Sequence, residues 1–92
     1  MQTYTYTAFD GDPTLGGTSI PPMTERKVKA RDSYRALTRA QAFTEQYVKT
    51  SCDYVGTHRY YVLVWRDKIL LERGFVDVEK GRPAFWKREE LL

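Results

Sequence analysis

Histidine and cysteine are nearly absent from this 92-residue sequence, which has one of each, His58 and Cys52. A single cysteine excludes a disulfide within the chain and favours a reducing compartment. A single histidine excludes the pair of imidazoles that many zinc sites use. We therefore expect neither a metal nor another cofactor.

Long apolar runs are missing as well. No stretch approaches the roughly 18 consecutive apolar residues that a membrane-spanning helix requires. The N-terminal residues, Met-Gln-Thr-Tyr-Thr-Tyr, carry neither the basic nor the apolar segment of a signal peptide. The sequence therefore predicts a cytoplasmic protein without a membrane partner.

The composition is that of a small globular domain, with 41% hydrophobic and 29% charged residues. Residues 1–92 are predicted to form one domain. A chain of this length buries only about 60–70% of the surface of its unfolded state, so we expect a thin core of one helix on one sheet. The net charge of +3 permits an anionic partner without requiring one.

Residues 25–52 are the stretch around which the rest of the chain can be arranged. In residues 25–31, small apolar residues alternate with cations, as in a strand with one covered face. Asp32 or Ser33 can then cap a helix over residues 34–50, which contain neither glycine nor proline. Its predicted core stripe consists of Ala36, Leu37, Ala40, Phe43, Thr44 and Tyr47, with Val48 at the margin.

The N-terminal segment predicts a strand followed by a long loop. Residues 3–9 alternate threonine with aromatic or apolar residues, which predicts a strand with Tyr4, Tyr6 and Ala8 on one face. Residues 10–23 contain too many glycines and prolines for regular structure. They predict a flexible loop, which is either merely mobile or functional.

The C-terminal half predicts a β-hairpin. Residues 60–65, Tyr-Tyr-Val-Leu-Val-Trp, are strongly β-forming, and residues 66–68 make a tight turn into a partner strand over residues 69–78. Gly74 inside that strand indicates a bulge or bend, beyond which the opposite set of side chains would point inward. The inward set would change from Ile69 and Leu71 to Val76 and Val78.

The last residues predict a short helix, for which Pro83 suits the first turn. Phe85, Glu89 and Leu92 would share one of its faces. Together the segments predict an α+β fold: a four-stranded antiparallel sheet in β-β-α-β-β order, with one main helix packed on one face and a short C-terminal helix.

Catalytic chemistry finds little support in the sequence. Cys52 and His58 could form a nucleophile and a base, but a small thiol at a helix end and a loop histidine are the simpler interpretation. Asp10 and Asp12 lack the further ligands and the closing glutamate of a calcium loop. We therefore expect a protein that is not an enzyme and has no small-molecule substrate.

Basic residues on the second strand are more informative. If Val28 and Ala30 face the helix, then Lys27, Lys29 and Arg31 project from the open face of the sheet. There they would lie beside the threonines of the first strand, and cations with hydroxyl donors can contact phosphates. The alternative is a solvated edge strand whose lysines prevent aggregation.

Other candidate residues lie on the helix and among the aromatic residues. Arg35 and Arg39, one turn apart, form a second basic patch or an ordinary solvated helix face. Tyr60 or Tyr61 would add a stacking platform to the open sheet face, and surface aromatics next to arginines are typical of protein interfaces. The candidate partner-binding residues are Lys27, Lys29, Arg31, Arg35, Arg39, Arg59 and Tyr60.

The strand over residues 27–31, followed by Tyr34 and by Ala36 and Ala40 on the helix, resembles many small proteins of phages and mobile elements. The size, the glycine- and proline-rich loop and the lack of an active site are similar to anti-CRISPR proteins that inhibit type I effector complexes. Several of these wedge between Cas subunits and touch guide RNA. The resemblance implies a phage inhibitor that acts in the host cytoplasm on an RNA-guided nuclease, through contacts with protein and guide RNA. Many such inhibitors are acidic DNA mimics, and this basic chain departs from that pattern.

A second class of function stays open beside the first: a small regulatory module that binds RNA or DNA directly. Such a module would bind naked oligonucleotides with a steep salt dependence, because each neutralised phosphate releases counterions. An inhibitor of a nucleoprotein complex would bind free oligonucleotide weakly and the assembled complex tightly.

Overall fold

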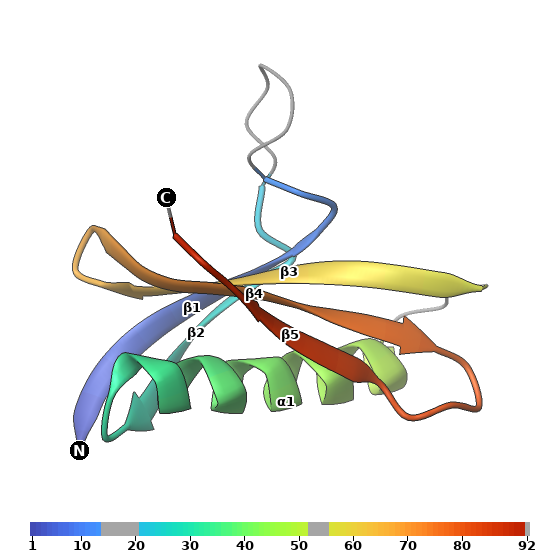
Figure 1. The fold of residues 1–92 in the computed structure, drawn as a ribbon, viewed down its shortest axis with the longest axis horizontal. Helices are drawn as coiled ribbons and strands as arrows, with labels where there is room; N and C mark the ends of the chain where they lie inside the picture. The colour runs from blue at the N-terminus through green and yellow to red at the C-terminus, as the bar shows by residue number, and fades with distance from the viewer. Residues whose placement is uncertain (14–20, 52–55, 92) are drawn as a thin grey trace.

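The computed structural model describes residues 1–13, 21–51 and 56–91. Within these residues the chain forms, in order, β1 (Gln2–Asp10), β2 (Thr24–Ala30), α1 (Ser33–Ser51), β3 (Thr57–Arg66), β4 (Ile69–Glu79) and β5 (Phe85–Glu89). The strands make one antiparallel sheet in the spatial order β2-β1-β3-β4-β5. Helix α1 lies across one face of this sheet (Figure 1). The predicted α+β class, with one main helix on an antiparallel sheet, is confirmed.

Helix α1 begins where the sequence provides a cap. The Oδ1 atom of Asp32 accepts a hydrogen bond from the backbone N–H of Arg35 at 2.8 Å, which satisfies one of the unpaired donors of the first turn. The same bond lowers the pKa of the Asp32 carboxyl. Ser33 instead donates its hydroxyl to Glu72 at 3.3 Å, so Asp32 is the capping residue of the two that were predicted.

The core lies between α1 and the sheet. The inward side chains of β1 and β2 are those that the alternation predicts: Tyr4, Tyr6, Ala8, Val28 and Ala30. Strands β3 and β4 add Tyr60, Val62, Val64, Val76 and Val78. The helix covers them with Ala36, Leu37, Ala40, Thr44 and Val48. The core is therefore one helix layer on one sheet face, as expected for so short a chain.

Two positions of α1 depart from the predicted core stripe. Phe43 leaves 43% of its surface exposed and stacks on Tyr6 from the margin, with 6.4 Å between the ring centroids. Gln41 is buried instead. Its Nε2 atom donates hydrogen bonds to the backbone oxygen of Phe75 at 3.2 Å and to that of Lys87 at 3.0 Å. The buried amide is therefore paired, and it joins the helix to β4 and β5.

Gly74 explains how Gln41 reaches these two carbonyls. A Cβ atom at position 74 would lie 2.6 Å from the backbone oxygen of Lys87 and 2.8 Å from Nε2 of Gln41. Neither approach is compatible with normal packing, so the close contact of α1, β4 and β5 requires glycine. Gly74 is thus the position of β4 that the Gln41 side chain and the Lys87 carbonyl approach closely.

The bulge predicted at Gly74 lies elsewhere in β4. The register between β3 and β4 shifts between Val64 and Trp65, which leaves Leu71 as the extra residue on β4. Beyond it, the later part of β4 presents the inward set that was predicted. Ile69, predicted to point inward, leaves 65% of its surface exposed, because it lies at the end of the hairpin.

The C-terminal segment differs most from the prediction. Residues 85–89 form β5 at the edge of the sheet in place of the predicted short helix. A helix of that length is marginal without packing, whereas the edge of β4 offers backbone hydrogen-bond partners. Cross-strand ion pairs support the strand, Arg73 with Glu89 and Glu72 with Arg88. The sheet therefore has five strands, and the prediction of four was wrong.

Candidate binding surface on the open sheet face

The face of the sheet turned away from α1 is called here the open face (Figure 1). Side chains alternate along a strand, and paired residues point to the same side, so the register assigns the residues of this face. The β2 and β1 part carries Glu25, Lys27, Lys29, Thr3, Thr5 and Thr7. The β3 to β5 part carries Arg59, Tyr61, Trp65, Arg73, Phe75, Asp77, Phe85 and Lys87.

Lys27 and Lys29 project from the open face as predicted, opposite Thr5 and Thr3. Both lysines are exposed. Neither forms an ion pair with any residue that the structure describes. Arg31 is exposed too, but it follows the last residue of β2 and lies outside the strand ladder. The predicted strand patch therefore consists of two lysines in register with two threonines.

Arg59 is engaged within the fold. Its guanidinium makes a bidentate ion pair with Asp77, at 2.7 and 3.0 Å, and its Cζ atom lies 3.8 Å from the ring centroid of Phe75. The hydrogen bonds to Asp77 raise the pKa of Arg59 above its ordinary value. Although half of this side chain is exposed, its charge is already balanced, so it is a weaker candidate for an anionic partner than its position in the sequence indicates.

Arg73 is the second arginine of the open face, and it too is paired. It donates to Glu89 at 2.9 Å and to Asp12 at 3.0 Å, and only 15% of its side chain is exposed. Its Cζ atom lies 5.1 Å from the ring centroid of Tyr61. The pair with Asp12 holds the beginning of the β1–β2 segment on this side of the sheet. The arginines of the open face thus stabilise the fold.

Tyr60 does not belong to the open face. It is 3% exposed and lies in the core cluster under α1, opposite Val76. Its neighbour Tyr61 faces the other way, opposite Phe75, with 6.0 Å between the two ring centroids. The candidate role of Tyr60 is therefore wrong, and of the two predicted tyrosines only Tyr61 can contribute to a stacking surface.

Arg35 and Arg39 lie on the exposed side of α1, in the layer opposite the open face (Figure 1). Arg35 is paired with the capping Asp32 at 2.6 Å. Arg39 forms no ion pair with any described residue. As predicted, the helix patch is separate from the lysines of β2, so one flat partner cannot contact both.

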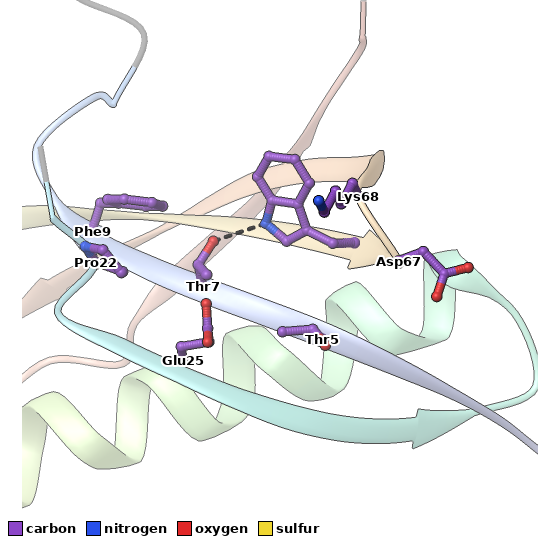
Figure 2. A pocket seen from close by; sticks show the side chains of 8 residues that line it. Thr5, Thr7, Phe9, Pro22, Glu25, Asp67 and Lys68 are labelled. Atoms are coloured by element: carbon purple, nitrogen blue, oxygen red, sulfur yellow. Dashed lines mark hydrogen bonds between the residues drawn. The ribbon is translucent and has the colours of Figure 1, made fainter. Parts of the chain in front are cut away.

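A hollow of about 560 Å³ is sunk into the open face beside the lysines. It is lined by Thr5, Thr7, Phe9, Pro22, Glu25, Trp65, Asp67 and Lys68 (Figure 2). The Nε1 atom of Trp65 donates a hydrogen bond to Oγ1 of Thr7 at 3.0 Å, which holds the indole over β1. Glu25 and Lys68 were not among the predicted candidates. Glu25 could have been found, because it lies two residues before Lys27 and so shares its face.

A second concave region lies between α1 and β2. Two adjoining hollows of about 270 and 370 Å³ share Arg26 and the exposed ring of Phe43. Burial raises the pKa of the Tyr6 hydroxyl despite the positive charge of Arg26 nearby. Arg26 therefore lies beside a core residue at the edge of these hollows.

Among the residues that the structure describes, no three His, Cys, Asp or Glu side chains gather as metal ligands. His58 lies in β3, with its Nδ1 atom 4.0 Å from Asp10 and its ring stacked on Tyr60.

The predicted roles of Cys52, of Leu92 and of residues 14–20 in the loop lie outside the described residues. Within that same part of the chain, no helix is both long and apolar enough to cross a membrane.

Comparisons of the chain with known protein families, with curated proteins and with solved structures found no match.

Proposed function

We propose that this chain is a non-enzymatic binding protein that docks on a nucleoprotein complex through the open face of its sheet. One observation supports it above the others. The arginines of the open face, Arg59 and Arg73, form ion pairs within the fold. Lys27 and Lys29, in contrast, have no ion-pair partner among the described residues. Exposed lysines without an ion-pair partner, next to threonine hydroxyls, can contact the backbone phosphates of a nucleic acid.

The mixed character of the face favours a nucleoprotein over naked nucleic acid. The two lysines share it with Glu25 and with Phe85, which leaves 58% of its surface exposed. The whole chain has 15 basic and 12 acidic residues, a weak field for attracting a free polyanion. Exposed aromatic side chains are instead typical anchors on protein. In its most specific form, the proposal is a phage inhibitor of an RNA-guided nuclease that touches both Cas protein and guide RNA in the host cytoplasm.

The alternative is a regulatory module that binds single-stranded RNA or DNA directly. Trp65 supports this alternative, because its indole is held at the surface of the sheet beside the lysines, and bases stack on such rings. The two functions differ in what is bound tightly. The module binds naked oligonucleotide, and the docking protein binds the assembled complex.

The test is a pair of double charge reversals that change the net charge equally. Lys27→Glu with Lys29→Glu is expected to weaken binding to a purified RNA-guided nuclease complex about 100-fold or more, because attraction becomes repulsion. Arg35→Glu with Arg39→Glu, on the other layer, should change the affinity by less than about threefold, since screening limits charges at that distance. Thermal unfolding of both variants verifies that the fold is retained.

Two results would overturn the proposal: equal affinity after the strand reversal, or a loss confined to the helix reversal. The salt dependence adds an independent measurement. If the lysines contact two phosphates of a single strand, Lys27→Ala with Lys29→Ala should reduce the slope of log K against log salt by about 1.4. Tight, salt-sensitive binding of the native chain to naked oligonucleotide would favour the regulatory module.

A further inference from the structure

The hollow on the open face places a carboxylate against an indole. Glu25 lies opposite Thr7 in the β1–β2 ladder, and Trp65 donates its N–H to the hydroxyl of the same threonine. In Figure 2 the Glu25 side chain rises toward Thr7 and into the hollow. Glu25 forms no hydrogen bond or ion pair with the residues that the structure describes. Its oxygens are therefore available to a ligand that lies along the indole.

The shape and lining of the hollow suit a flat aromatic ligand. Its volume of about 560 Å³ leaves space for a ring system with its attached sugar, and Phe9 and Pro22 form the wall away from the hairpin turn (Figure 2). The indole is the flat surface on which such a ring would stack. The hydrogen bond to Thr7 fixes the indole before any ligand arrives, which reduces the entropy lost on binding.

We infer that this hollow binds one guanine base of the nucleic acid whose phosphates lie on Lys27 and Lys29, an inference that rests on the proposed function. An ionised carboxylate has two acceptor oxygens and no donor. The Watson–Crick edge of guanine presents two adjacent donors, N1–H and the N2 amino group, so Glu25 can accept both. Adenine and cytosine present one amino donor beside an acceptor nitrogen, and uracil presents one N–H between two carbonyls. Glu25 therefore pairs with both donors of guanine and with one donor of any other base.

The register places the phosphate contacts at a matching distance. Lys27 follows Glu25 by two residues on the same face, so their Cα atoms lie about 7 Å apart. A base edge held by Glu25 thus leaves its own or the adjacent phosphate within reach of Lys27. Lys68 lines the hollow beside Trp65 and can take a phosphate on the other side. A single strand would then cross β2, β1 and the end of β3.

Trp65 itself reports on the site. The chain has two tryptophans, so Trp86→Phe leaves Trp65 as the only source of indole fluorescence. In that background, short uridine-rich RNA with one central guanine, inosine or adenine is titrated against the emission. Guanine should bind about tenfold tighter than adenine or more. Inosine lacks the N2 amino group and should lose about fivefold relative to guanine.

Substitution of the carboxylate gives the sharper test. Glu25→Gln exchanges one acceptor oxygen for an amino donor, so the preference for guanine should fall below about twofold while stacking still quenches Trp65. Glu79→Gln is the matched control, because it makes the same chemical change on a carboxylate at the far end of β4 that does not line the hollow. It should keep the guanine preference intact.

The outcomes separate this inference from the proposed function. Equal affinity for the three bases, an unchanged preference in Glu25→Gln, or no change in Trp65 emission with any RNA would overturn the guanine site. Binding to the complex that still depends on Lys27 and Lys29 would leave the docking function standing. Conversely, stronger quenching by GMP than by AMP, abolished by Glu25→Gln, would support the guanine site even if no nucleoprotein complex is bound.

Discussion

The contact between Gln41 and Gly74 makes a quantitative prediction about how β5 is held to the rest of the fold. Strand β5 is an edge strand of five residues that carries Lys87 of the open face. On its inner side it is joined to α1 by the Gln41 amide, which donates to the carbonyls of Phe75 and Lys87. Two variants disrupt this contact in different ways. Gln41→Ala removes the amide, and Gly74→Ala adds a methyl group where the amide of Gln41 and the carbonyl of Lys87 lie.

The expected losses follow from the geometry. In Gln41→Ala the buried carbonyl of Phe75 loses a donor, whereas that of Lys87 lies nearer the edge and can bind water, so we expect about 2 kcal/mol. In Gly74→Ala the new Cβ would approach the Lys87 oxygen to 2.6 Å and the Gln41 amide to 2.8 Å. Backbone must then move, which costs about 1–3 kcal/mol. Both changes break the same contact, so the double variant should be more stable than the sum predicts by about 1 kcal/mol.

Urea unfolding followed by circular dichroism measures the free energies of unfolding of the four chains in this cycle. Each kcal/mol should also appear as a fall of about 4–8 °C in Tm. Gln46→Ala, the same chemical change on the exposed side of α1, is the matched control and should stay within about 0.5 kcal/mol of the native chain. The prediction is contradicted if Gln41→Ala lowers the free energy of unfolding no more than Gln46→Ala does. It is also contradicted if the losses from Gln41→Ala and Gly74→Ala add up in the double variant.

Two further predictions concern single hydrogen bonds. Folding lowers the pKa of the Asp32 carboxyl, so the ionised carboxylate stabilises the fold fully above the pKa of the unfolded chain, and this stabilisation is lost as the pH falls below about 4. Asp32→Asn still caps the helix but does not titrate, so it should lose less Tm than the native chain between pH 5 and pH 3. An identical loss of Tm in the two chains would contradict the prediction. Thr7→Val removes the acceptor for Trp65 and should cost about 1 kcal/mol; in the Trp86→Phe background it should also raise the accessibility of Trp65 to acrylamide, whereas unchanged quenching would show that the bond does not hold the indole.

Local patterns in the sequence predicted much of the fold. The alternation in β1 and β2 gave the correct faces, because each strand has one polar side and the period of two is unambiguous there. The helix was predicted within one residue at each end, because a cap precedes it and no breaker interrupts it. These features depend on neighbours in the sequence, and such patterns carry that information well.

Features that depend on distant residues were predicted poorly. Residues 85–89 have no decisive pattern of their own, and β5 forms because β4 provides an edge and two charge partners. Gln41 was not part of the predicted core stripe, yet it is buried and donates to carbonyls 34 and 46 residues away. In β3 the run around Tyr60 is apolar on both faces, so its period could not tell Tyr60 from Tyr61.

The candidate cations show the same limit in a form that bears on function. By sequence, Arg59 and Lys27 are both basic candidates for contact with a partner. The register decides between them, because it brings Asp77, 18 residues away, within a bidentate bond of Arg59, while Lys27 lies opposite a threonine. The planar guanidinium suits such fixed pairs, and the flexible ammonium group is left for mobile or external anions. On this fold the arginines of the open face therefore stabilise the sheet, and the lysines of its β2 edge, which have no ion-pair partner among the described residues, are the charges that we propose a partner contacts.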